Sequence, residues 1–444
     1  MLRTFLTAAV LFFLASAEAF ASGRALSLKD ALDLGLRENP GLKAAESSTA
    51  ASGEDIGIAQ SALLPKVFFE ERFSRTNNPT FAFSSKLNQE RFTQDDFAIT
   101  SLNDPRPIND FQTSVAFEQP LYMRRAGLGI RMAREEYAAR KDDLERKREL
   151  TAFEIARTYI MVNTAAEAIK AAEKGVEAAR EHLRLAEARD AAGIGLLSDV
   201  LLARTGLVEA EQRLVTARKE QAVAKRMLGL LLGVDDEIGT SEAVLPLALR
   251  DIEHYLSNAA GRSDIRSASR RFGNAETNIE LSRSGFFPML GVGGSYFLND
   301  HETLFGSEGQ SWQVSAFLRW NIFDGMLTSH EARKARHLSS EALSRLDGMK
   351  RAAVFNVRRA WLAVEEAAKK KELTQAALRS AEEGERLLRL RYENSLSPIV
   401  ELLDAESSLE RARASHVMNE DALASALLEL SLESGTVLKD LGVE

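Results

Sequence analysis

The amino-acid sequence contains one architecture twice in tandem, and this repetition constrains the fold more than any other feature. The segment from Asn39 to Val67 matches the segment from Arg262 to Leu290 with a constant shift of 223 residues, and the shift is about 202 through the later helical parts. A chain of 444 residues has room for two or three unrelated domains, but the repetition predicts two copies of one supersecondary unit. The expected division is residues 22–232 for the first copy, 233–249 for a linker containing Pro246, 250–432 for the second copy and 433–444 for a C-terminal tail.

Each copy contains long stretches in which apolar residues recur at alternating steps of three and four. One seam in the first copy runs through Ile155, Tyr159 and Val162, and another begins at Val200 and Ala203. This spacing is typical of coiled-coil heptads. It predicts one helical hairpin per copy, over about residues 125–232 and 328–432. A continuous helix over the first part of either hairpin would be far longer than a compact domain allows.

Ahead of each hairpin the hydrophobic period drops to two, which is typical of strands with one apolar face. The four predicted strands cover about residues 64–76, 110–122, 286–300 and 311–324. They have about the length that a tilted transmembrane strand needs, although the alternation fits a soluble sheet packed on the helices equally well. The side chains that we expect to face lipid are Val115, Phe117, Trp312, Leu318 and Trp320.

Four strands cannot enclose a barrel, and open edges in lipid would leave backbone groups unpaired at several kcal/mol each. A membrane-spanning sheet of this size therefore has to be completed by other subunits. Residues 1–21, MLRTFLTAAVLFFLASAEAFA, have the basic start, short apolar run and small final residues of a secretory signal peptide. The expected fold class is mainly α with a small β part: two tandem coiled-coil hairpins plus four transmembrane strands.

Composition excludes several classes of function. The net charge of −8 gives no long-range attraction for nucleic acid, so no nucleic-acid partner is expected. The chain has no Cys, and its six His show no metal-binding spacing, so we expect no metal and no cofactor. Adjacent carboxylate pairs such as Asp142–Asp143 and Glu365–Glu366 point apart on a helix, and no phosphate-binding loop or Ser/His/Asp arrangement accompanies them, so we do not expect an enzyme.

Two turns between predicted helices carry a family resemblance. The first runs from Arg189 to Asp199 (RDAAGIGLLSD) and the second from Arg391 to Glu401 (RYENSLSPIVE), each with an acid ten residues after the Arg. In these features the chain resembles the TolC-like outer-membrane efflux family. The resemblance implies a homotrimer whose twelve strands form one barrel in the outer membrane, with helices that continue as an α-barrel through the periplasm. It also implies a passive exit duct of a tripartite efflux pump or a type I secretion system, served by a periplasmic adaptor and an inner-membrane pump. The alternative is a periplasmic coiled-coil adaptor or scaffold.

The resemblance assigns roles to both turns. The expected gate consists of Arg189, Asp199, Arg391, Tyr392, Glu401 and Asp404. The expected adaptor docking tip consists of Ala192, Gly193, Ile194, Ser395 and Leu396. Two simpler readings stay open: Gly193 permits a helix-ending turn, and the acids offset a helix dipole. Ser397 departs from the family, which has Arg there, so the gate is expected to be looser or differently connected.

Overall fold

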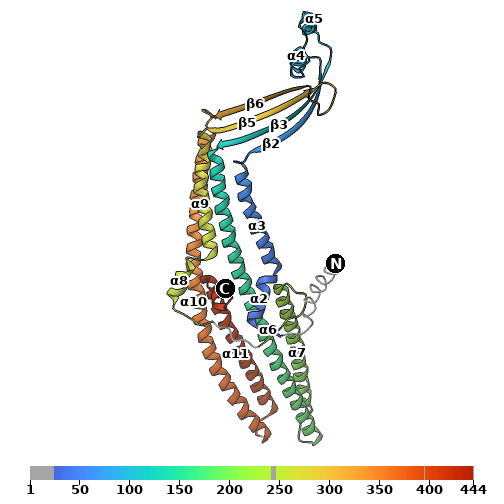
Figure 1. Ribbon diagram of the computed structural model, residues 1–444. Coiled ribbons are helices and arrows are strands. Elements are labelled where there is room, and N and C mark those ends of the chain that lie inside the picture. The colour runs from blue at the N-terminus through green and yellow to red at the C-terminus, as the bar shows by residue number, and fades with distance from the viewer. Residues whose placement is uncertain (1–24, 242–246, 395, 444) are drawn as a thin grey trace, which may run out of the picture. The chain divides into compact units, whose positions relative to one another are not determined.

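The computed structural model describes residues 25–241, 247–394 and 396–443. The expected signal peptide, Pro246 and Ser395 lie outside these residues. The chain divides into two compact units, which we call the helical unit (25–48, 141–267 and 347–443) and the sheet unit (49–140 and 268–346). Their elements are labelled in Figure 1.

The sheet unit contains one antiparallel sheet to which each sequence copy contributes a pair of strands. The strands are β2 (Lys66–Thr76), β3 (Ile108–Tyr122), β5 (Met289–Asp300) and β6 (Gly309–Arg319), in the order β2-β3-β5-β6 (Figure 1). The third strand begins at Met289 because Ser284–Phe286 forms a short 3₁₀ helix, and the fourth ends at Arg319 instead of near 324. Trp320, expected within the last strand, therefore lies just beyond it.

The strand register places most of the exposed apolar side chains on one face. One cross-strand row joins Phe69, Val115, Tyr296 and Trp312, and the neighbouring row ends at Val314. These side chains are exposed in the single chain, with Trp312 at 75% and Val314 at 69%. This face is largely apolar, and the row with Glu71, Thr113 and Gln310 interrupts it. An exposed apolar face of this kind requires an apolar neighbour, and among the described residues β2 and β6 are the two open edges of the sheet.

The segment between β2 and β3 carries the residues that the second copy lacks. It forms α4 (Pro79–Asn88), a 3₁₀ turn at Gln94–Phe97 and α5 (Ile99–Asn103). Lys86 Nζ lies 2.5 Å from Asp96 Oδ1, and Asp96 also caps the turn at Thr93. At the base, the buried Gln89 side chain donates to Asp110 Oδ1 at 2.9 Å.

Four long helices form the two hairpins. They are α6 (Arg124–Ala191) with α7 (Leu197–Leu232), and α10 (Leu327–Glu393) with α11 (Ile399–Ser434). Two further helices, α3 (Pro40–Ser61) and α9 (Ser263–Arg283), precede the strands of each copy. Within the described ranges, none of the helices is long and apolar enough to cross a membrane.

Short elements complete the core of the helical unit. These are β1 (Ala25–Leu26), α2 (Leu28–Glu38), β4 (Gly239–Thr240), α8 (Ile252–Ala259) and α12 (Val437–Leu441). β4 comes from the expected linker and pairs in parallel with β1, and the Tyr159 hydroxyl lies 2.9 Å from the Leu26 carbonyl oxygen. α12 comes from the expected tail, and its Val437 and Leu441 are buried in the core with Leu32. Both segments are therefore integral parts of this unit.

Candidate functional site: the hairpin tips

The first hairpin turns tightly after α6. Gly193 has φ of +71°, and the backbone N–H of Ile194 donates to the Arg189 carbonyl at 3.1 Å. Gly195 also has to be small, because a Cβ there would lie 2.7 Å from the backbone nitrogen of Asp190. Gly193 thus ends the helix in a left-handed backbone conformation, which glycine adopts without steric cost. A Cβ at Gly193 would meet nothing within 4 Å, so its outer side is open.

The second turn is built differently and contains no Gly. The Leu396 N–H donates to the Arg391 carbonyl at 2.8 Å, and the Asn394 side chain donates to the Leu390 carbonyl at 2.7 Å. Pro398 then precedes α11 in an extended conformation. The Ser397 hydroxyl is buried and has no hydrogen-bond partner within the described chain.

The two hairpins pack against each other at this end of the helical unit. Ala186, Val200 and Ala203 of the first hairpin form one buried cluster with Tyr392 and Leu402 of the second. Small side chains on one side leave room for the Tyr392 ring, which is only 4% exposed. The packing therefore joins two segments that are about 200 positions apart in the sequence.

Arg189 and Tyr392, both expected at the gate, are in direct contact. The Arg189 guanidinium lies over the Tyr392 ring at 4.1 Å from its centre, and its Nη2 donates to the Tyr392 carbonyl at 3.1 Å. Burial raises the pKa of the Tyr392 hydroxyl, the charge of Arg189 opposes this rise, and the charge of Asp199 adds to it. Asp199 is thus close enough to act on Tyr392 electrostatically, but the principal partner of Tyr392 within one chain is Arg189.

A second contact between the hairpins was not anticipated from the sequence. His182 on α6 is 7% exposed, and its Nε2 lies 2.7 Å from Glu406 Oε2 on α11. Arg389 also reaches Glu406, at 3.2 Å. His182 lies beside the heptad seam, where periodicity alone predicts apolar packing rather than a contact between polar side chains. The available signal is a histidine beside a seam that is otherwise apolar.

Three of the other expected gate residues are solvent-facing in the single chain. Arg391, Glu401 and Asp404 are exposed, and Asp199 is half-buried in the first turn of α7. Glu401 and Asp404 are three residues apart and share a helix face. The structure thus brings Arg189, Asp199 and Tyr392 together and leaves the other three at the surface.

The expected docking residues are also at the surface. Ala192, Gly193 and Ile194 are exposed, with Ile194 at 80%, and Leu396 is 69% exposed. Beside the second turn, an apolar groove is lined by Leu387, Leu390 and Leu396 together with Gly384 and Arg391.

The expected lipid-facing residues lie in or next to the sheet. Val115, Phe117, Trp312 and Leu318 occupy its apolar face and are 40–75% exposed. Trp320 is 56% exposed, and its indole N–H donates to the Phe286 carbonyl at 3.0 Å.

Comparison with known proteins identifies the family. A sequence profile of outer membrane efflux proteins matches residues 31–234 and 256–436, one match for each copy. The chain belongs to the outer membrane efflux protein family. Protein CyaE of Bordetella pertussis is 27% identical over 420 residues, which span 92% of this chain and 84% of that protein.

Two solved structures share the fold of this outer membrane efflux protein. A membrane protein from Pseudomonas aeruginosa has a TM-score of 0.80 at 21% identity, with 92% of each chain covered. The CmeC outer membrane channel of Campylobacter jejuni has a TM-score of 0.77 at 17% identity, with 92% of this chain and 86% of that chain covered. The expected fold class, mainly α with a small β part, is confirmed.

Membership of this family confirms the predicted function and location. The protein is an outer-membrane efflux channel that extends into the periplasm and acts as an exit duct. The alternative of a periplasmic adaptor or scaffold is therefore set aside. The family consists of transport channels rather than enzymes.

Proposed function

We propose that three copies of this chain form one channel whose twelve strands close a barrel in the outer membrane. The observation that carries the proposal is the sheet with two open edges, β2 and β6, and one largely apolar face. In lipid, each unpaired backbone group on those edges would cost several kcal/mol, so the edges have to pair with those of other copies. Three copies of four strands match the trimeric architecture of the family.

Disulfide cross-linking tests this arrangement, because the chain has no native Cys. Cysteine pairs that combine Phe68, Glu70 or Arg72 on β2 with Gln313 or Ser315 on β6 should cross-link neighbouring copies into a ladder that ends at three chains. The matched control is Glu70→Cys with Ser114→Cys, a cross-strand pair within one chain, which should give no ladder. A native mass of one or two chains in mild detergent would refute the trimer.

We further propose that the hairpin tips close the channel in its resting state. The contact between Arg189 and Tyr392 holds the two hairpins of one chain together, and Tyr392 and Asp199 add a contact between hairpins that breaks on opening. A hydrogen bond with one charged partner contributes about 1.5–3 kcal/mol, and three copies of it are enough to shift an open–closed equilibrium strongly. Glu401 and Asp404 from three copies would place six carboxylates around the axis.

Single-channel recording tests the gate. Tyr392→Phe and Asp199→Ala should raise conductance in planar bilayers with normal trimer yield. Replacing Glu401 and Asp404 with Ala should instead reduce cation selectivity and block by multivalent cations. Unchanged conductance in the first two variants would mean that other contacts close the tips.

The channel is proposed to receive its substrate from an inner-membrane pump through a periplasmic adaptor that docks at the two turns. The support is the exposed tip around Gly193 and the apolar groove beside Leu396. A photo-crosslinker at Ile194 should capture an adaptor hairpin, identified by mass spectrometry, while one at the exposed Val215 on the α7 shaft should not. Equal capture at both positions would contradict tip docking.

A substitution at Gly193 can distinguish a role in adaptor docking from a role in forming the turn. Asn tolerates the left-handed conformation, so Gly193→Asn should keep the turn, but its side chain would occupy the open outer surface. If Gly193 serves only to end the helix, the channel with Gly193→Asn should transport its substrate at the wild-type rate. If it is a docking surface, transport should fall while trimer yield is preserved.

A further inference from the structure

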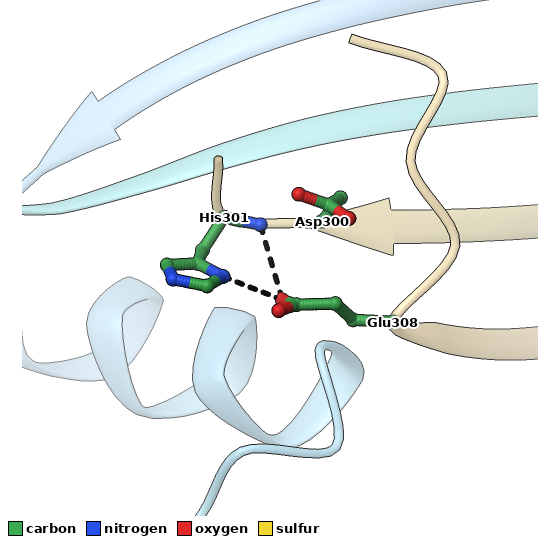
Figure 2. A group of neighbouring side chains, drawn as sticks. All are labelled: Asp300, His301 and Glu308. Atoms are coloured by element: carbon green, nitrogen blue, oxygen red, sulfur yellow. Dashed lines mark hydrogen bonds and ion pairs between the residues drawn. The ribbon is translucent and has the colours of Figure 1, made fainter. Parts of the chain in front are cut away.

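Outside the hairpin tips, one cluster of side chains has the composition of a metal site. Asp300, His301 and Glu308 lie in the β5–β6 connection, and one ligand atom from each falls within 4.8 Å of the others (Figure 2). Asp300 is the last residue of β5, and Glu308 directly precedes the first residue of β6. The antiparallel register, which pairs Asn299 with Gly309, therefore brings the two ends of the loop together.

The loop backbone holds Asp300 in one orientation. Its Oδ1 accepts hydrogen bonds from the backbone N–H groups of Glu302 at 2.7 Å and Thr303 at 2.8 Å. Asp300 is 7% exposed, whereas Glu308 is exposed, so the cluster extends from the sheet edge to solvent. Gly306 is needed here, because a Cβ at that position would collide with the Asp300 carboxylate.

His301 has a carboxylate at each ring nitrogen. Its Nδ1 lies 2.7 Å from Glu308 Oε2, and its Nε2 lies 3.0 Å from Glu302 Oε1. Figure 2 shows the His301 ring and the Glu308 carboxylate turned toward each other. Histidine ligands in metal sites characteristically donate their second ring N–H to a carboxylate, which fixes the tautomer and the ring orientation. Glu302 is placed to accept the N–H of Nε2, which leaves Nδ1 free to bind the metal.

The charges also favour a cation. Asp300, Glu302 and Glu308 supply three carboxylates against one imidazole, and in the described part of the chain none of them forms an ion pair with Lys or Arg. Even a protonated His301 leaves the cluster with an excess of negative charge. One imidazole and two carboxylates form a ligand set that suits Zn²⁺ and similar transition metals better than Ca²⁺ or Mg²⁺, which prefer oxygen alone.

We propose that the β5–β6 loop binds one divalent transition-metal ion of the Zn²⁺ type through Asp300, His301 Nδ1 and Glu308, with Glu302 as the orienting partner. Binding replaces any proton on Nδ1, which passes to solvent, and the half-exposed side of the cluster leaves a position for water. The ion ties the end of β5 to the start of β6 and so fixes the loop. The site depends only on the sheet unit, and neither the gate nor the docking tip takes part in it.

Zn²⁺ binding to the full chain without an affinity tag tests the proposal. Isothermal titration in detergent should give one Zn²⁺ per chain for the wild type. His301→Gln and Glu308→Gln should weaken binding at least about tenfold, and Glu302→Gln should weaken it by about 10–100-fold, as loss of an orienting partner does elsewhere. Asp300→Asn keeps the acceptor for the loop N–H groups and should also lose affinity. His337→Gln removes an exposed histidine on α10 and should leave binding unchanged.

Two further measurements keep the proposal falsifiable if a variant assembles poorly. Zn²⁺ should slow cleavage of the wild-type loop by a Glu-specific protease, with no protection in His301→Gln. Co²⁺ should give visible d–d absorption that His301→Gln abolishes. The proposal is overturned if the wild type binds no Zn²⁺, if His301→Gln binds it as tightly as the wild type, or if Ca²⁺ binds as tightly as Zn²⁺ without needing His301.

Discussion

At the scale of single residues, Arg189 and Arg391 occupy equivalent positions in the two copies but have different surroundings. The residue after Arg189 is Asp190, whereas the residue after Arg391 is Tyr392. Arg189 stacks on that tyrosine across the hairpins, and Arg391 is exposed. The two hairpins are therefore not interchangeable, although their sequences follow one pattern.

This difference predicts unequal effects of two matched substitutions. Arg189→Ala removes a cation–π contact worth about 0.5–2 kcal/mol and a hydrogen bond to the Tyr392 carbonyl, so it should raise resting conductance. Arg391→Ala removes the same charge from an exposed site and should change conductance less. Single-channel recording at fixed salt concentration compares them, and equal effects would show that net charge, not the stack, controls closure.

At the scale of elements, the sheet supports a prediction about its two faces. Leu318 lies on the apolar face opposite Leu290, whereas Gln313 lies on the polar face opposite Ser295. Arg at a lipid-facing position near the bilayer midplane costs about 2–4 kcal/mol, so Leu318→Arg should reduce the yield of folded trimer and Gln313→Arg should not. Heat-resistant trimer on gels measures this yield, and equal yields would refute the assignment of the faces.

The loop between β2 and β3 has an acid-sensitive element. The hydrogen bond from Lys86, helped by the backbone N–H of Thr93, lowers the pKa of Asp96 from 3.8 to about 2. Because the folded pKa lies below the unfolded value, the contribution of Asp96 to loop stability is complete above about pH 4 and is lost as the pH falls toward 2. Pepsin cleavage within residues 78–107 should rise over this interval. Lys86→Gln should move the rise to higher pH, and a rise at the same pH in both proteins would contradict the role of Lys86.

At the scale of the whole molecule, the sequence predicted the features that depend on periodicity. The apolar positions recur often enough along the helices, as at Ile155 and Tyr159, to predict the helices without a structure. The alternation along the strands does the same for the sheet. Contacts between segments far apart, such as His182 with Glu406, leave no periodic trace. Asp300, His301 and Glu308 were missed for a related reason, since a search for paired histidines passes over a cluster with one His that a strand register assembles.

The C-terminal segment is a second example of packing that periodicity does not predict, and it allows a test. The extent of the repeat predicted a tail at residues 433–444, yet Val437 and Leu441 of α12 are buried in the core. Full burial of such side chains contributes about 1.5–3 kcal/mol each, so truncation after Gly435 should lower the melting temperature of the trimer clearly. Lys439→Ala should leave it nearly unchanged. Calorimetry on both variants decides whether α12 supports the core.

The open edges of the sheet have a consequence for how many channels a cell makes. In the proposed trimer the strands are fully paired only when three copies assemble, so by mass action the number of complete channels depends on the third power of the free chain concentration. Near the assembly threshold, halving that concentration lowers the number of complete channels by roughly eightfold. Small changes in synthesis or export then act as a steep control on transport capacity, before any gate opens or closes.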